Sequence, residues 1–179
     1  MNIEKLKFPI GKYIFINNPD IKVINNWIDD IERFPSRIKE LVTGIQDSQL
    51  NLRYRPEGWT VKQVIHHCAD SHMNSLIRFK LALTEDTPKI RPYHEDKWAE
   101  LVDSQDDRIL DSILLLIALH SRWVKILKNL SPEDLKKEFE HPEHGTKFSL
   151  EENIGIYAWH CNHHYAHIEL ALEAKGKHN

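Results

Sequence analysis

Four histidines lie close together near the C-terminus: His160, His163, His164 and His167. The segment around them contains neither Gly nor Pro and has the apolar spacing of a helix. On a helix, His160 and His164 project from the same side one turn apart, and so do His163 and His167. Two imidazoles at i and i+4 can share one metal ion, with ring nitrogens about 2.0–2.1 Å from zinc. Two ligands do not complete a metal site, so another segment must supply at least one more.

The helical spacing indicates which pair borders the protein interior. The residues expected to form the core stripe of this helix are Ile154, Tyr157, Ala158, Cys161, Tyr165, Ile168 and Leu172. At about 100° per residue, His164 lies about 60° from the centre of this stripe, and His160 and His167 lie on the same flank. His163 points to the far side, so we expect it to face solvent or a partner subunit. The pattern therefore favours His160 and His164 as the metal-binding pair.

The third ligand is less well defined by the residues alone. On a helix predicted from about Val61 to Leu83, His67 lies on a polar flank and His72 on the apolar face. The polar flank also contains Ser71, Asn74 and Arg78. Periodicity slightly favours His72 for burial, but a buried histidine is more often a core residue with a hydrogen-bond partner. The same reservation applies to His120 on the third helix, and the spacing leaves the third ligand open.

Four long helical segments would position these side chains. Their predicted ranges are Ile21 to Ile45, Val61 to Leu83, Asp106 to Asn129, and Leu150 to Lys175. Pro35 interrupts the first, so we expect a kink or break near Phe34. Residues 1–20 are predicted to form an extended arm, and residues 138–149 a small hairpin around His144-Gly145. The pattern predicts an all-α four-helix bundle in which residues 1–179 form a single domain.

Composition excludes several functional classes. The 179 residues carry a formal charge of −3 without a basic cluster, so no nucleic-acid surface is expected. No apolar run is long enough for a membrane helix, and no secretory signal precedes the first helix, so we expect a cytoplasmic protein. Cys68 and Cys161 form no C-x-x-C motif and fall on core stripes, which indicates packing rather than redox chemistry.

Three segments carry a family resemblance: Arg55-Pro-Glu-Gly-Trp-Thr-Val-Lys-Gln-Val-Ile-His-His67, Ala69-Asp-Ser-His-Met-Asn-Ser75 and Trp159-His160-x-x-x-His164-x-x-His-Ile. Together they resemble the DinB/YfiT-like family of small bacterial proteins. The resemblance spans nearly the whole chain and implies a four-helix bundle that binds one divalent metal through three histidines. The first family ligand comes eight residues after the tryptophan that opens the second helix, which is His67 here, and His160 and His164 match the other two. The resemblance also implies zinc, with nickel as the alternative. We expect a homodimer because Trp159 and His163 face away from the core stripe of the last helix, and the resemblance points the same way.

Three imidazoles and an open coordination position are typical of a catalytic zinc site. Such a metal can activate water or a substrate carbonyl, and it can also deprotonate a bound thiol. The resemblance therefore implies a metal-dependent hydrolase acting on a small molecule. The alternatives are a low-molecular-weight thiol S-transferase of the bacillithiol or glutathione type, and a non-enzymatic bundle that a metal stabilises.

Four residues are candidates for positioning a substrate: Asn74, Arg78, His120 and Arg55. We expect the open position to face Asn74 and Arg78, with neither Asp70 nor Glu169 reaching the metal. The sequence leaves open the roles of His72, His120 and His167, the physiological metal, and the substrate.

Overall fold

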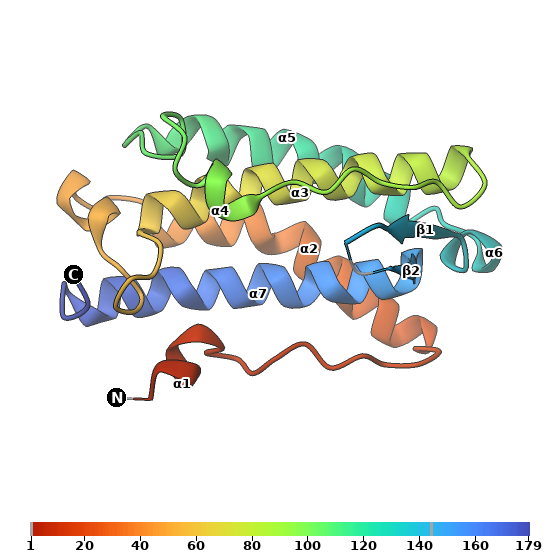
Figure 1. The fold of residues 1–179 in the computed structure, drawn as a ribbon, viewed down its shortest axis with the longest axis horizontal. Helices are drawn as coiled ribbons and strands as arrows, with labels where there is room; N and C mark the ends of the chain where they lie inside the picture. Colours follow the sequence, from red (N-terminus) through yellow and green to blue (C-terminus); the bar gives the residue numbers. More distant parts are fainter. Residues whose placement is uncertain (1, 144) are drawn as a thin grey trace.

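Four long helices form the body of the protein, which is described here from a computed structural model covering residues 2–143 and 145–179. They are α2 (Ile21–Leu41), α3 (Val61–Thr84), α5 (Ile109–Leu127) and α7 (Leu150–Ala174). Figure 1 shows them lying side by side along the long axis, which confirms the predicted four-helix bundle. Short elements connect or precede them: α1 (Ile3–Lys7), η1 (Asp47–Asn51), α4 (Glu95–Trp98) and α6 (Pro132–Leu135).

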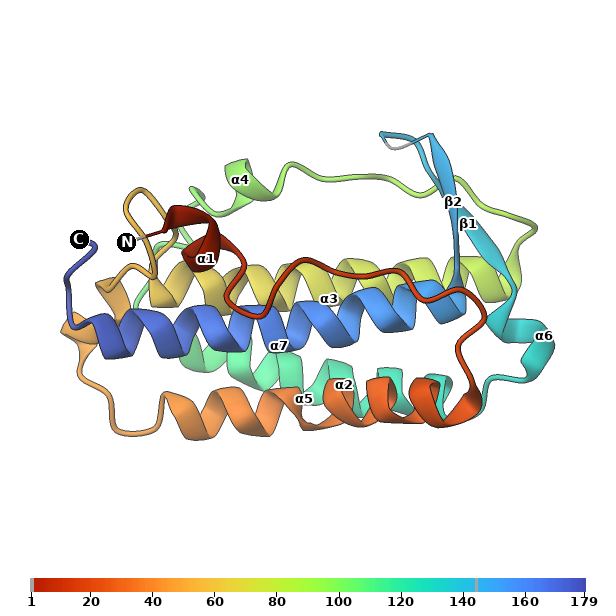
Figure 2. The ribbon, with the colours of Figure 1, turned by 90° about the horizontal axis from the view of Figure 1, so that it is seen from below.

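The predicted hairpin is present before the last helix. Strands β1 (Glu138–His141) and β2 (Thr146–Ser149) pair antiparallel, with Phe139 opposite Phe148. His144, which we placed in the turn, lies outside the described residues. The segment before α4 extends this pairing, because Ile90 donates its N–H to the carbonyl of Glu140 at 3.0 Å. The hairpin and this segment thus form one layer beside the ends of α3 and α7 (Figure 2).

The order of the helices around the bundle differs from their order in the chain. α2 packs mainly on α5 and α7, and α3 packs on the same two helices. α2 and α3 therefore lie diagonally opposite each other although they follow one another in sequence. This arrangement places α3 beside α7, so the histidines of these two helices can meet across one interface (Figure 2).

The helix starts follow the capping chemistry of the sequence. The Asp20 carboxylate accepts the Val23 N–H at 2.8 Å at the start of α2. Thr60 and Gln63 form a reciprocal capping box at the start of α3. Such caps replace the hydrogen bonds that the first turn of a helix lacks, and each contributes about 1 kcal/mol. α3 therefore begins at Val61, which places His67 in the second turn of this helix.

Of the kink or break expected near Phe34, the break does not occur, because α2 continues through Pro35 from Ile21 to Leu41. Proline has no N–H, so the carbonyl of Ile31 lacks its usual helical donor. The ring nitrogen Nδ1 of His120 on α5 donates to this carbonyl at 2.7 Å instead. Packing of buried Ile31, Phe34 and Pro35 against the core also retains the helix. Tertiary contacts thus compensate for the missing helical hydrogen bond.

The N-terminal arm corrects the prediction for His163. The arm starts with α1, which the sequence did not indicate, and runs along α7 (Figure 2). Trp159 donates its indole N–H to the carbonyl of Gly11 at 3.1 Å, and the Phe8 ring lies 6.0 Å from the His163 ring. His163 is consequently buried rather than facing solvent. A helical wheel counts only the bundle core, whereas the arm adds a second packing surface to α7.

Candidate metal centre

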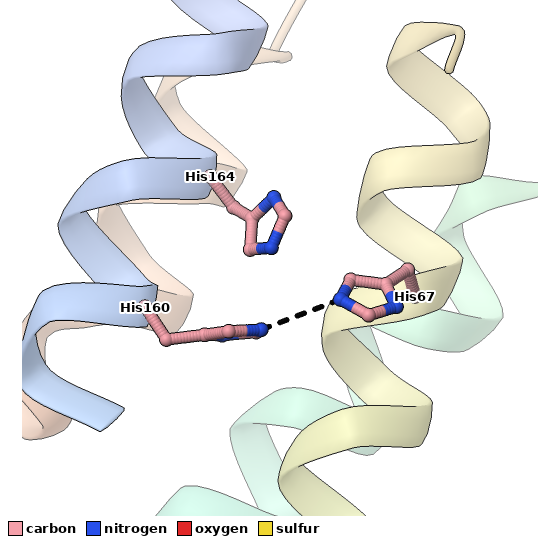
Figure 3. Close-up of side chains that lie close together, drawn as sticks. All are labelled: His67, His160 and His164. Atoms are coloured by element: carbon pink, nitrogen blue, oxygen red, sulfur yellow. Dashed lines mark hydrogen bonds between the residues drawn. The ribbon is translucent and has the colours of Figure 1, made fainter. Parts of the chain in front are cut away.

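His67, His160 and His164 converge between α3 and α7 (Figure 3). One ring nitrogen from each lies within 4.8 Å of those of the other two. The Nε2 atoms of His67 and His160 are 3.3 Å apart. Two nitrogens bound tetrahedrally to one zinc ion would be about 3.3–3.4 Å apart, given bonds of about 2.0–2.1 Å. The separation of this pair therefore fits a shared ion.

All three imidazoles are held in the neutral form that a metal requires. Burial, together with the neighbouring His163, lowers the pKa of His67 to about 4. Burial also lowers the pKa of His160 and His164 well below the ordinary histidine value, and the neighbouring histidines add to the effect. Near neutral pH no proton has to leave these rings before a metal binds.

A second group on α7 contains His163, His164 and His167, whose ring nitrogens also lie within 4.8 Å of one another. His164 belongs to both groups. His167 donates from Nε2 to the carbonyl of Lys7 at 3.1 Å, and its ring stacks on Tyr54 at 3.8 Å. Its Nδ1 lies 3.4 Å from Nδ1 of His164. His167 is thus attached to the arm, and it also contacts the predicted ligand His164.

A cavity of about 450 Å³ adjoins the three-histidine cluster. Its wall is formed by Ser71, Arg78, Tyr93, His94, Glu95, Asp96, Phe139, His141, Glu143, Phe148, Asn153, Ile156, Tyr157 and His160. These residues come from α3, α7, the segment around α4 and the hairpin. His160 belongs both to the cluster and to the cavity wall, so a small molecule in the cavity can reach the cluster.

Only one of the four candidate substrate residues lines this cavity. Arg78 does so, and its Nε is buried without a hydrogen-bond partner among the described residues. Asn74 instead donates to the carbonyl of Asp70 on its own helix at 2.9 Å. Arg55 lies over the Tyr54 ring, 5.4 Å from its centroid, and donates to the carbonyl of Pro56. His120 is buried in the core. The expectation that Asn74 faces the open side is therefore not supported by its position.

Sequence reasoning missed several residues of the cavity wall. The hydroxyl of Tyr157 donates to the carbonyl of Ser71 at 3.1 Å, and the Ser71 hydroxyl lies 3.5 Å from Nε2 of His160. Tyr157 was assigned to the core stripe, because periodicity does not distinguish a core residue from a cavity wall. Tyr93 and Phe148 lie on a connection and a hairpin whose positions the sequence did not define. Ser71 lies four residues after His67 on the same polar flank, and this was the one sequence signal that could have placed it in the cavity wall.

The acidic residues behave as expected in one respect. Neither Asp70 nor Glu169 joins a group of ligand atoms close enough to share a metal within the described part of the chain. Asp70 instead lines a separate depression with Asp103, Asp106 and Asp111. Burial and the charge of Asp103 raise the pKa of Asp70 to about 6. Among the described residues, the cluster that could hold a metal is therefore made of histidines.

The fold is a diagonal four-helix bundle with a histidine cluster between its second and last long helices. The model of the DinB superfamily matches residues 30–168, and the chain belongs to this superfamily. The structure of YfiT from Bacillus subtilis, described as "a probable metal-dependent hydrolase with an unusual four-helix bundle topology", superimposes with a TM-score of 0.92. It is 45% identical, and the match covers 96% of this chain and 98% of YfiT.

Two sequence relatives carry the same description. A protein of Oceanobacillus iheyensis named "putative metal-dependent hydrolase" is 51% identical, over 94% of this chain and 97% of the relative. A protein of Bacillus mycoides with the same description is 47% identical, over 96% of this chain and 98% of the relative. These similarities confirm the predicted family.

Proposed function

We propose that this protein is a metal-dependent hydrolase of a small molecule, with a divalent ion, preferably zinc, held by His67, His160 and His164. The observation that carries the proposal is the convergence of three neutral imidazoles beside a cavity of about 450 Å³. The names of the relatives point the same way. When bound, the ion supplies a Lewis acid that polarises a substrate carbonyl and activates water.

The cavity residues have separate roles in this proposal. The cavity wall includes the apolar side chains of Phe139, Phe148 and Ile156, which would contact the body of the substrate. Arg78 presents a guanidinium there and would bind an anionic or carbonyl group of the substrate. Ser71 and Tyr157 are hydrogen-bonded to each other beside His160 and would orient groups that enter the cluster.

A thiol S-transferase is the second candidate. The cavity carries Arg78 on α3, Glu95 and Asp96 on α4, and Glu143 between the two strands of the hairpin. This combination of charges suits a small thiol that carries both an amine and a carboxylate, as thiols of the bacillithiol or glutathione type do. The thiol would use the same metal site, because coordination removes its proton.

The proposal is tested with protein purified without added metal. Elemental analysis should find close to one divalent ion per chain, and a panel of activated esters, amides and lactones should reveal hydrolysis that a chelator abolishes. The same panel is repeated with small thiols and electrophiles, where thiol consumption without hydrolysis would identify the transferase. A metal-loaded protein that is inactive in both panels would favour the non-enzymatic bundle. Protein that binds no divalent ion at all would refute the hydrolase.

A further inference from the structure

Two buried histidines, His72 and His120, connect the three-histidine cluster to the backbone of α2. Nε2 of His72 lies 3.0 Å from Nδ1 of His160, and Nδ1 of His72 lies 2.7 Å from Nε2 of His120. Nδ1 of His120 lies 2.7 Å from the carbonyl oxygen of Ile31. The three rings come from α3, α5 and α7, and the carbonyl comes from α2. All four long helices therefore contribute to one continuous series of hydrogen bonds.

The direction of every bond follows from the carbonyl at its end. A carbonyl oxygen only accepts, so Nδ1 of His120 must carry the proton. A neutral imidazole has one donor and one acceptor, so Nε2 of His120 accepts from Nδ1 of His72. Nε2 of His72 then accepts from Nδ1 of His160, and Nε2 of His160 is left with its lone pair. This is the nitrogen that lies 3.3 Å from Nε2 of His67.

We propose that His72 and His120 are positioning residues that hold His160 in the Nδ1–H tautomer and so direct the Nε2 lone pair of His160 toward the metal. The inference rests on the proposed function, because it takes His160 as a ligand. A hydrogen bond to the second ring nitrogen of a ligating histidine fixes its tautomer and orientation. Here two further histidines carry that constraint to a backbone carbonyl.

The surroundings keep both intermediate rings neutral and in place. His72 and His120 are 0% and 2% exposed, so a positive charge on either would lack solvation. Burial lowers the pKa of His120 to about 4 and that of His72 well below the ordinary value. The rings of Phe34, Trp123 and Tyr157 pack around His72 with centroids 5.2, 6.0 and 5.5 Å away.

The carbonyl is available because of a residue that otherwise opposes helix formation. Pro35 offers no N–H to the carbonyl of Ile31, four residues earlier. The buried oxygen would then lose a hydrogen bond without His120, which donates to it. Pro35 is therefore connected to the three-histidine cluster through His120 and His72. No spacing in the sequence indicates this connection.

The test uses the full-length protein with and without zinc. His72→Phe removes both hydrogen bonds but retains an aromatic ring, whereas His72→Gln keeps an acceptor for Nδ1 of His160. His66→Gln is the matched control, since His66 is also buried on α3 and hydrogen-bonded to Ser112 on α5. Its ring is bonded to Ser112 and to the Asp106 carbonyl rather than to any of the three predicted ligands. Zinc affinity is measured by competition with a chelating dye. The tautomer of His160 is read from long-range ¹H–¹⁵N spectra of the metal-free protein.

We expect metal-free wild-type protein to show His160 protonated at Nδ1 alone. His72→Phe should lower zinc affinity by about 10–100-fold, with His72→Gln in between and His66→Gln unchanged. Equal zinc affinity of His72→Phe and His66→Gln, or a wild-type His160 protonated at Nε2, would overturn the inference. If His72→Phe fails to fold, the wild-type spectrum and His72→Gln decide it. If wild-type protein binds no zinc, the proposed function fails. The tautomer measurement still tests whether His72 and His120 hold His160 in the Nδ1–H form.

Discussion

The Nε2 atoms of His67 and His160 face each other at 3.3 Å, although the two residues are 93 positions apart in the chain. Neutral imidazoles in such a contact gain at most one hydrogen bond, and His164 adds a third ring beside them. A divalent ion would satisfy all three at once, because each ring would contribute a lone pair. The arrangement is therefore better explained as a ligand set than as core packing.

Replacing a ligand should remove the metal without unfolding the bundle. We expect His164→Ala to lose bound zinc and turnover, because two imidazoles and water bind the ion more weakly than three imidazoles do. The apolar contacts of the four helices should keep the circular dichroism spectrum helical. Elemental analysis and the spectrum are the measurements. His94→Ala, which alters the cavity wall but not the cluster, should retain its zinc. A His164→Ala protein with full metal content would contradict the ligand assignment.

Arg78 should affect substrate use but not metal content. Its guanidinium lines the cavity, and its Nε has no partner in the described structure. A hydrogen bond to a charged group contributes about 1.5–3 kcal/mol, so Arg78→Met should lower kcat/KM by about 10–150-fold on a substrate found in the panel. Arg78→Lys should recover part of the loss by restoring the charge. An unchanged kcat/KM in Arg78→Met would exclude Arg78 from substrate binding.

The metal-free protein should become less stable as the pH falls below about 6.5. Burial depresses the pKa of His67 and of His163 to about 4, whereas unfolded histidine titrates near 6.5. Between these values the unfolded chain binds more protons, so the free energy of unfolding rises with pH. Each group adds up to about 1.4 kcal/mol per pH unit in this window.

Urea unfolding of chelator-treated protein between pH 7.5 and 4.5 measures this dependence. His163→Phe removes one of the buried histidines while keeping a ring against Phe8, so its stability should depend less steeply on pH. A free energy of unfolding that stays flat across the window in the wild-type protein would show that these histidines do not titrate differently in the folded state.

The homodimer stays a prediction, but its sequence argument changes. We based it on Trp159 and His163, and the arm of the same chain covers both. A row on α5 now offers the exposed apolar surface: Leu110, Leu114 and Ile117 are 58%, 54% and 39% exposed. We expect light scattering to give twice the chain mass at micromolar concentration, and Leu114→Glu to give a monomer. A wild-type monomer would refute the dimer, and a dimeric Leu114→Glu protein would exclude this surface.

Among the described residues no helix has the length and apolarity needed to span a bilayer. The expected cytoplasmic location remains a prediction, which cell fractionation would check.

The sequence by itself determined the four long helices and where two of them begin. Apolar periodicity and the caps at Asp20 and Thr60 act over a few residues, so they can be read without tertiary contacts. The i, i+4 spacing of His160 and His164 is local in the same way. The choice of His67 over His72 came from a family resemblance, because His67 lies on the polar flank of its helix and periodicity slightly favoured His72 for burial.

Only the tertiary structure decided what surrounds the cluster. Which helix lies beside α7, and which diagonal to it, depends on packing between distant segments rather than on local pattern. The burial of His163 by the arm and the link from Pro35 through His120 to His72 follow from that packing. A helical wheel describes each helix alone. It cannot show that a carbonyl left without a donor on one helix orients a histidine on another.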